Sequence, residues 1–103
     1  MAELKVFWTQ TAKKQRDYIF EYWNKRNKSA NYSKKLNISI RDRINLLKDH
    51  PEIGKEVDFK NTKAISLGHY SILYKIMRPK IIITAFWDNR QDPEKFIKSL
   101  KKN

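Results

Sequence analysis

The chain opens with an alternation of apolar and polar positions and then changes to a helical period. Residues 4–8 alternate in this way, which predicts a first strand. Thr9 offers an N-cap hydroxyl, and the stretch that follows to about Lys28 contains neither glycine nor proline. We therefore predict a first helix from Thr9 to about Lys28. Its apolar face consists of Ala12, Ile19, Tyr22 and Trp23.

A second helix is predicted from about Ser29 to Asp49. Apolar residues recur along it at spacings of four, four, four and three: Tyr32, Leu36, Ile40, Ile44 and Leu47. Pro51 ends the helix, because a proline ring cannot continue the hydrogen-bond ladder. Since only residues 27–30 separate the two helices, we expect an antiparallel helical hairpin.

The rest of the chain has the pattern of β-structure. Strands are predicted at 63–67, 70–77 and 80–87, with Gly68 and His69 as a two-residue turn between the first two. The strand at 80–87 is Ile-rich and should be buried on both faces. A short helix is expected to start at Asp92-Pro93-Glu94. The sequence thus predicts a single α+β domain over 1–103 with a mostly antiparallel sheet of about four strands, whose order the spacing does not fix.

Composition excludes several classes of protein. The chain has 103 residues and no cysteine, which excludes disulfide scaffolds, thiolate metal sites and cysteine nucleophiles. No apolar run approaches the length of a membrane span, and the first residues lack the apolar core of a signal peptide. We expect a cytoplasmic protein that has no membrane partner. His50 and His69 are far apart, so neither a metal site nor a cofactor is expected.

Charge is the strongest compositional feature. The formal net charge is +12, and residues 9–50 hold 11 basic and 4 acidic residues, a net +7. Residues 51–92 are nearly neutral at +2, and residues 93–103 carry +3. Such a charge favours either nucleic acid or an acidic protein as the partner, and the total does not decide between them.

Several stretches together resemble one family, the RelE/ParE-superfamily toxins of bacterial type II toxin–antitoxin pairs. The similar stretches are Val6-Phe7-Trp8-Thr9 with Ala12, Ile19 with Tyr22, Ile44 and Leu47 with Pro51 and Gly54, Tyr70-Ser71-Ile72-Leu73-Tyr74, and Ile81 to Trp87 followed by Asp88-Asn89-Arg90-Gln91-Asp92-Pro93. The resemblance covers nearly the whole chain.

This resemblance implies a helical hairpin packed on a small curved sheet. It also implies an antitoxin whose acidic, extended segment wraps the toxin and neutralises it, with operator DNA contacted only through that antitoxin. Two toxic activities occur in the superfamily. RelE-like members cut mRNA in the ribosomal A site, whereas ParE-like members poison DNA gyrase and cut nothing themselves.

The residues that resemble the RelE-like catalytic set are incomplete. Tyr70 is followed by Ser71 where those toxins commonly have an arginine, and the position similar to their catalytic tyrosine is Phe96. Arg90 matches a functional arginine of those toxins. Where they are expected to have a pair of lysines, this chain has only Lys63. If the chain is a ribonuclease, its candidate residues are Lys63, Arg90 and His69, although a histidine at a turn is more often a solvated one.

We therefore favour a ParE-like toxin that binds a cellular target, with DNA gyrase as the first guess. The alternatives are a RelE-like ribosome-dependent mRNA endonuclease and an inactive protein that only binds the antitoxin. The candidate contacts with target or antitoxin are Lys13, Arg16, Lys34, Arg41, Asp88, Asn89 and Arg90. A structural interpretation competes for Arg90, namely an ion pair with Asp88 or Asp92. Trp8, Trp23, Tyr70 and Tyr74 are expected in the core rather than as stacking platforms.

Overall fold

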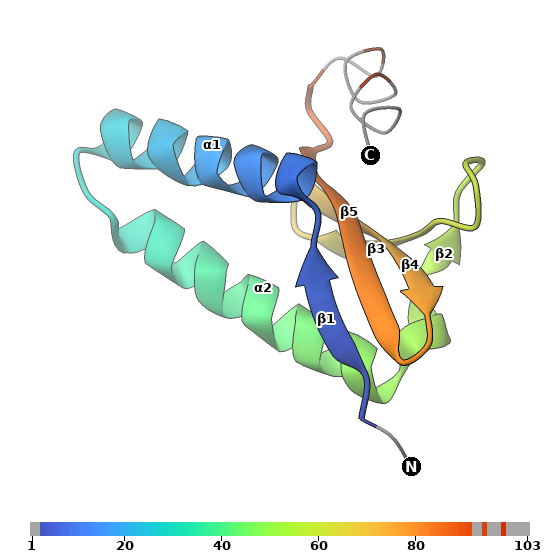
Figure 1. Cartoon of the computed structure of the whole chain (residues 1–103). Coiled ribbons are helices and arrows are strands. Elements are labelled where there is room, and N and C mark those ends of the chain that lie inside the picture. The colour runs from blue at the N-terminus through green and yellow to red at the C-terminus, as the bar shows by residue number, and fades with distance from the viewer. Residues whose placement is uncertain (1–2, 92–93, 95–97, 99–103) are drawn as a thin grey trace.

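Two helices pack against one face of a five-stranded sheet in the computed structural model, which describes residues 3–91, 94 and 98 (Figure 1). The chain order is β1 (Lys5–Trp8), α1 (Gln10–Asn27), α2 (Asn31–Asp49), a 3-10 turn η1 (Pro51–Ile53), β2 (Lys55–Glu56), β3 (Lys63–Leu67), β4 (Tyr70–Met77) and β5 (Lys80–Asp88). The predicted α+β class and the helical hairpin are confirmed.

Helix α1 begins and ends where its capping residues predict. The Thr9 hydroxyl accepts a hydrogen bond from the backbone N–H of Ala12 at 3.1 Å. Lys28 then adopts a left-handed conformation (φ 52°) and ends the helix. Ala12 and Ile19 are buried as expected, but Tyr22 is 45% exposed, so its place in the buried stripe was wrongly predicted. Tyr22 lies about 100° around the helix from Trp23 and faces outward.

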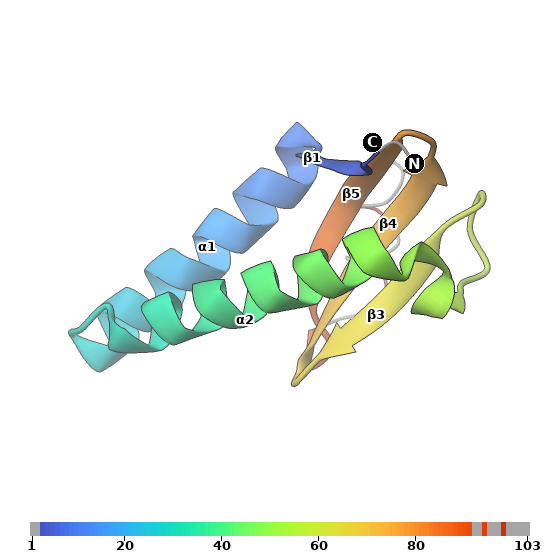
Figure 2. The same cartoon turned by 90° about the horizontal axis from the view of Figure 1, so that it is seen from below.

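Helix α2 carries the apolar stripe that its spacing predicts. Leu36, Ile40 and Leu47 are buried, whereas Tyr32, close to the hairpin tip, is 37% exposed. The Ser33 hydroxyl donates to the Phe20 carbonyl at 3.0 Å and also lies 2.7 Å from the Asn24 side-chain oxygen. These contacts join the helices near the tip, which projects beyond the sheet (Figure 2).

The strand order of the sheet is β1-β5-β4-β3-β2. Strand β1 pairs with β5 in parallel, and the other neighbours are antiparallel. The expectation of about four strands is corrected by β2, which pairs only Lys55 with Ala64 and Glu56 with Lys63. Two consecutive charged residues have no alternation, and therefore no periodicity could predict this strand.

The main core lies between the helices and the sheet. Strand β5 lies between β1 and β4, and Ile81, Ile83 and Phe86 are fully buried there, as predicted for a strand that is covered on both faces. Buried Tyr74 on β4 donates to the Pro51 carbonyl at 2.8 Å and accepts from the Gly54 N–H at 3.0 Å. The Tyr74 hydroxyl thus fixes the chain as it leaves α2, and burial raises the pKa of this phenol.

Most of the short helix expected from Asp92 onward, together with Phe96, lies outside the described residues. In the part of the chain that the structure describes, no helix is both long and apolar enough to cross a membrane.

Candidate functional site

A cleft of about 380 Å³ opens between α1 and the turn that follows β5. We call it the α1–β5 cleft. It is lined by Tyr18, Ile19, Tyr22, Trp23, Arg26, Asp88, Arg90 and Gln91. Tyr18 is 64% exposed, which leaves two aromatic rings, those of Tyr18 and Tyr22, at the solvent edge of a concave surface. Exposed rings beside a hollow are typical of a surface that receives a partner.

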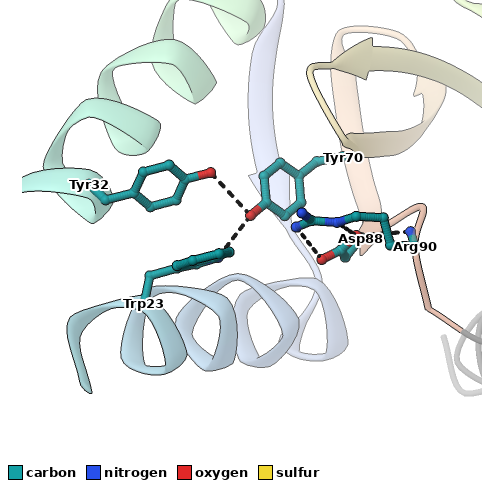
Figure 3. Close-up of polar contacts among 5 residues, drawn as sticks. All are labelled: Trp23, Tyr32, Tyr70, Asp88 and Arg90. Atoms are coloured by element: carbon teal, nitrogen blue, oxygen red, sulfur yellow. Dashed lines mark hydrogen bonds and ion pairs between the residues drawn. The ribbon is translucent and has the colours of Figure 1, made fainter. Parts of the chain in front are cut away.

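Three aromatic side chains from separate elements meet through the hydroxyl of Tyr70 (Figure 3). The indole N–H of Trp23 on α1 donates to this oxygen at 3.0 Å. The hydroxyl oxygen of Tyr32 on α2 lies 3.4 Å from it. The ring of Phe86 on β5 stacks on the Tyr70 ring, with 5.3 Å between the ring centres. Tyr70 is placed there because the turn at Gly68 (φ 61°) makes it the first residue of β4.

The Tyr70 phenol is held in its neutral form. Burial raises its pKa to about 12, and the hydrogen bond with Tyr32 acts in the same direction. Tyr70 and Tyr74 are buried, and Trp8 and Trp23 are half-buried, so the expectation that these rings belong to the core is confirmed. Trp23 has a second role as well, because one side of its ring forms part of the cleft wall.

Asp88 and Arg90 form a bidentate ion pair at the mouth of the cleft (Figure 3). The guanidinium Nε and Nη2 of Arg90 lie 2.9 and 2.8 Å from the two carboxylate oxygens of Asp88, and the backbone N–H of Arg90 donates to the same carboxylate at 2.9 Å. The guanidinium lowers the pKa of Asp88, and the carboxylate raises the pKa of Arg90. The structural interpretation of Arg90 is thus confirmed with Asp88 as its partner.

The cationic groups of the cleft gather around Trp23. The guanidinium carbon of Arg90 lies 6.0 Å from the ring centres of Trp23 and Tyr70, and that of Arg26 lies 5.9 Å from Trp23. Asp88 already neutralises Arg90, whereas no carboxylate among the described residues pairs with Arg26. Arg26 is therefore the cation of the cleft that is available to an acidic partner.

Asn89 points away from the cleft although it stands between Asp88 and Arg90. Its side-chain oxygen accepts from the Ser71 hydroxyl at 2.8 Å, and its backbone N–H donates to the His69 carbonyl at 2.8 Å. Asn89 fixes the end of β5 against the β3–β4 turn.

The structure places the predicted cations of the hairpin apart from the cleft. Lys13 is exposed on α1, and Lys34 and Arg41 are exposed on α2. The Arg16 guanidinium lies 4.8 Å from the ring centre of Trp8 and pairs with Asp17 at 3.1 Å. These four residues do not converge with Arg90 on one site.

The three ribonuclease candidates are also not gathered. Lys63 pairs with Glu52 at 3.5 Å and is in register with Tyr74, whereas Asp88, the partner of Arg90, is in register with Tyr70. Four residues of strand separate the two positions by about 13 Å. His69 is exposed at the turn, on the side of Asp88. Among the residues that the structure describes, no cluster of metal-ligating side chains is present.

Sequence reasoning missed Tyr18, Arg26 and Tyr32 as site residues. Tyr18, Tyr22 and Arg26 are spaced by four, which places them on one face of a helix. That spacing was a usable signal. Tyr32 had none, because its role depends on where the β3–β4 turn places Tyr70.

Both the sequence and the fold of this chain are similar to those of known proteins. The sequence model of the family described as "ParE toxin of type II toxin-antitoxin system, parDE" matches residues 6–93. Among solved structures, a chain of the "Chromosomal ParDE TA system from P. aeruginosa" superposes with a TM-score of 0.70 at 15% sequence identity, over 82% of this chain and 94% of that chain. At this identity the likeness establishes the fold alone. No curated protein matches the chain.

Proposed function

Because the chain belongs to the family of ParE toxins of type II toxin–antitoxin systems, we propose that it inhibits growth by binding a cellular target rather than by cutting RNA. DNA gyrase is the first candidate for that target. Membership of the family implies an antitoxin partner, and we propose that this antitoxin neutralises the toxin by covering the α1 side of its basic hairpin and the α1–β5 cleft.

The observation that carries the proposal is the state of the two groups best suited to phosphate chemistry. Cleavage of RNA through its 2′-hydroxyl needs a free cation near the phosphate and a group that can exchange a proton. The cationic charge of Arg90 is neutralised by Asp88, and Tyr70 is only 2% exposed, with its hydroxyl accepting from the Trp23 indole N–H. Both groups support the walls of a cleft, which suits recognition better than catalysis.

The chemistry of the cleft supports an acidic, partly apolar segment as the antitoxin contact. Exposed rings of Tyr18 and Tyr22 offer apolar area, and Arg26 offers a charge without a partner among the described residues. Aromatic and arginine side chains of this kind are the usual anchors of protein interfaces.

The test expresses the chain briefly in bacteria and scores two readouts side by side. We expect an SOS response from gyrase-linked DNA damage without cleavage of ribosome-bound mRNA. Co-expression of the short, acidic-tailed protein encoded by the neighbouring gene should abolish the response. Cleavage of mRNA that Arg90→Ala abolishes would instead assign the RelE-like activity, and soluble, folded chain without any growth effect would contradict a toxic function.

A further inference from the structure

Helix α2 carries a basic row on the side that faces solvent. Lys34, Arg41 and Lys48 recur every seven residues, with Asn37 and Asn45 between them. A spacing of seven returns to nearly the same face of a helix, and fourteen residues extend for about 21 Å. We call these five residues the α2 row. Lys34 and Arg41 are exposed, and Lys48 is half-buried.

The cations of the α2 row have no acidic partner among the described residues. Elsewhere in this part of the chain, Arg16, Lys25, Lys63 and Arg90 each pair with a carboxylate. The two acidic residues of α2, Asp42 and Asp49, each follow a row cation directly in sequence, which turns them about 100° away around the helix. Lys34 and Arg41 therefore present one sign of charge, whereas Asn45 and Lys48 share a hollow with Glu3 and Asp49 at the end of α2.

Lysine, arginine and asparagine side chains in one line are the set that contacts phosphate oxygens. The row contains no aromatic residue, and a single strand is bound by stacking its bases on aromatic rings. An acidic protein segment would need apolar anchor points. The exposed rings of Tyr18 and Tyr22 offer them at the α1–β5 cleft. On α2 the exposed apolar side chains are those of Tyr32, Ile38 and Leu46, and none of these belongs to the row. A straight, rigid row without rings suits the regularly spaced charges of a double helix.

We propose that the α2 row binds the phosphate backbone of duplex DNA without reading its sequence. This goes beyond the proposed function, because it requires neither gyrase nor antitoxin. It also differs from the expectation that DNA is contacted only through the antitoxin.

The test titrates the purified full-length chain into a short fluorescent DNA duplex at several salt concentrations. One variant removes the row cations (Lys34→Gln, Arg41→Gln, Lys48→Gln). A control variant removes three lysines from the other half of the chain (Lys55→Gln, Lys60→Gln, Lys75→Gln). Both variants have the same net charge, +9 from +12. We expect the slope of log K against log salt to fall by about 2.7 in the row variant, 0.9 for each lost phosphate contact, and by less than about 1 in the control.

Equal losses in the two variants would show that binding follows total charge, and the proposal would then fail. It would also fail if a single-stranded DNA or an RNA duplex bound as tightly, or if polyglutamate displaced the duplex at equal charge concentration. Circular dichroism and a thermal melt confirm that both variants are folded. Loss of DNA binding in a row variant that still triggers the SOS response would separate this proposal from the proposed function.

Discussion

The two sides of the helical hairpin hold their charges in opposite ways. In the α1–β5 cleft, Arg90 is fixed by Asp88, and the rings of Trp23 and Tyr70 are joined by a hydrogen bond. On the α2 row, Lys34 and Arg41 extend into solvent and pair with no described carboxylate. The cleft is pre-organised and partly apolar, whereas the row is polar and largely exposed to solvent.

This difference shows that the +7 charge of residues 9–50 is not one surface. A pre-organised cleft with rings suits a protein segment, because little entropy is lost when its walls are already ordered. A solvent-exposed basic row suits a polyanion, because its cations can replace the counterions that the polyanion releases. One net charge therefore covers two kinds of recognition, and variants on the two sides should differ in the size and sign of their effects.

The largest expected effect is on the cleft side. Trp23→Ala removes a half-buried ring that contacts Tyr22, Tyr32 and the Tyr70 hydroxyl. We expect a loss of roughly 3 kcal/mol in the free energy of unfolding, at the lower end for aromatic truncations because the ring is partly exposed. Urea denaturation measures this loss. The matched change on the row, Asn37→Ala, should cost less than about 0.5 kcal/mol. Similar losses at the two positions would contradict the contrast.

The second prediction concerns Tyr70 in alkaline solution. The folded state raises the pKa of this phenol to about 12, above the ordinary value near 10. The stability that comes from the neutral phenol is therefore fully present below about pH 10 and is lost as the pH rises through 12. Tyr70→Phe should remove this alkaline loss, and it should cost about 1 kcal/mol at neutral pH because the Trp23 indole N–H loses its acceptor.

Thermal melts between about pH 8 and pH 12 provide the measurement for Tyr70→Phe. Tyr18→Phe is the control, because the Tyr18 side chain is 64% exposed and no described residue accepts or donates a hydrogen bond to its hydroxyl. An alkaline transition that is the same in the wild type and in Tyr70→Phe would show that the buried hydroxyl does not hold the cleft wall.

The sequence predicted the parts of this molecule that depend on local pattern. The two helices, the Gly68 turn and the buried character of β5 follow from periodicity and turn chemistry, and the structure confirms them. Strand β2 and the parallel pairing of β1 with β5 depend on contacts between distant segments, which spacing does not encode.

The candidate site was predictable only in pieces. Arg90 was identified because it follows a strand and matches a functional arginine of the toxins that the sequence resembles, and Asp88 was considered as its ion-pair partner. The cleft itself depends on Trp23, Tyr32 and Tyr70, which lie far apart in sequence and converge only after the hairpin packs on the sheet. Tyr22 was assigned to the core because its side chain is largely apolar, without regard to the angle of this residue around α1. In the structure Tyr22 is exposed at the edge of the cleft.

A third, smaller effect is expected at the mouth of the cleft. The pair with Arg90 lowers the pKa of Asp88, so its stabilising effect is present above the ordinary aspartate pKa and is lost as the pH falls through the lower folded value. Asp88→Asn should reduce stability at pH 7 by about 1 kcal/mol or less, since Arg90 is half exposed. It should also flatten the acid side of the stability curve below about pH 4.

Asp42→Asn serves as the control for Asp88→Asn, because the Asp42 carboxylate pairs with no described cation. Unfolding curves at several acidic pH values compare the two variants. If Asp42→Asn flattened the acid limb as much as Asp88→Asn, the Asp88–Arg90 pair would carry no special weight in the cleft.

The smallest effect is expected on the α2 row, and its sign is opposite. Successive cations of the row, Lys34, Arg41 and Lys48, are seven residues apart, which is about 10 Å along the helix. Two like charges at that distance repel by roughly 0.4 kcal/mol in water without salt. The variant with glutamine at all three positions should therefore be slightly more stable than the wild type at low ionic strength, by less than about 1 kcal/mol. Because the separation is close to the Debye length at about 0.1 M salt, the gain should shrink as salt is added.

Differential scanning calorimetry at low and high salt measures this gain. A loss of stability, or a gain that salt does not reduce, would mean that the row cations support the fold as the cleft residues do, and the two sides of the hairpin would then not differ in kind.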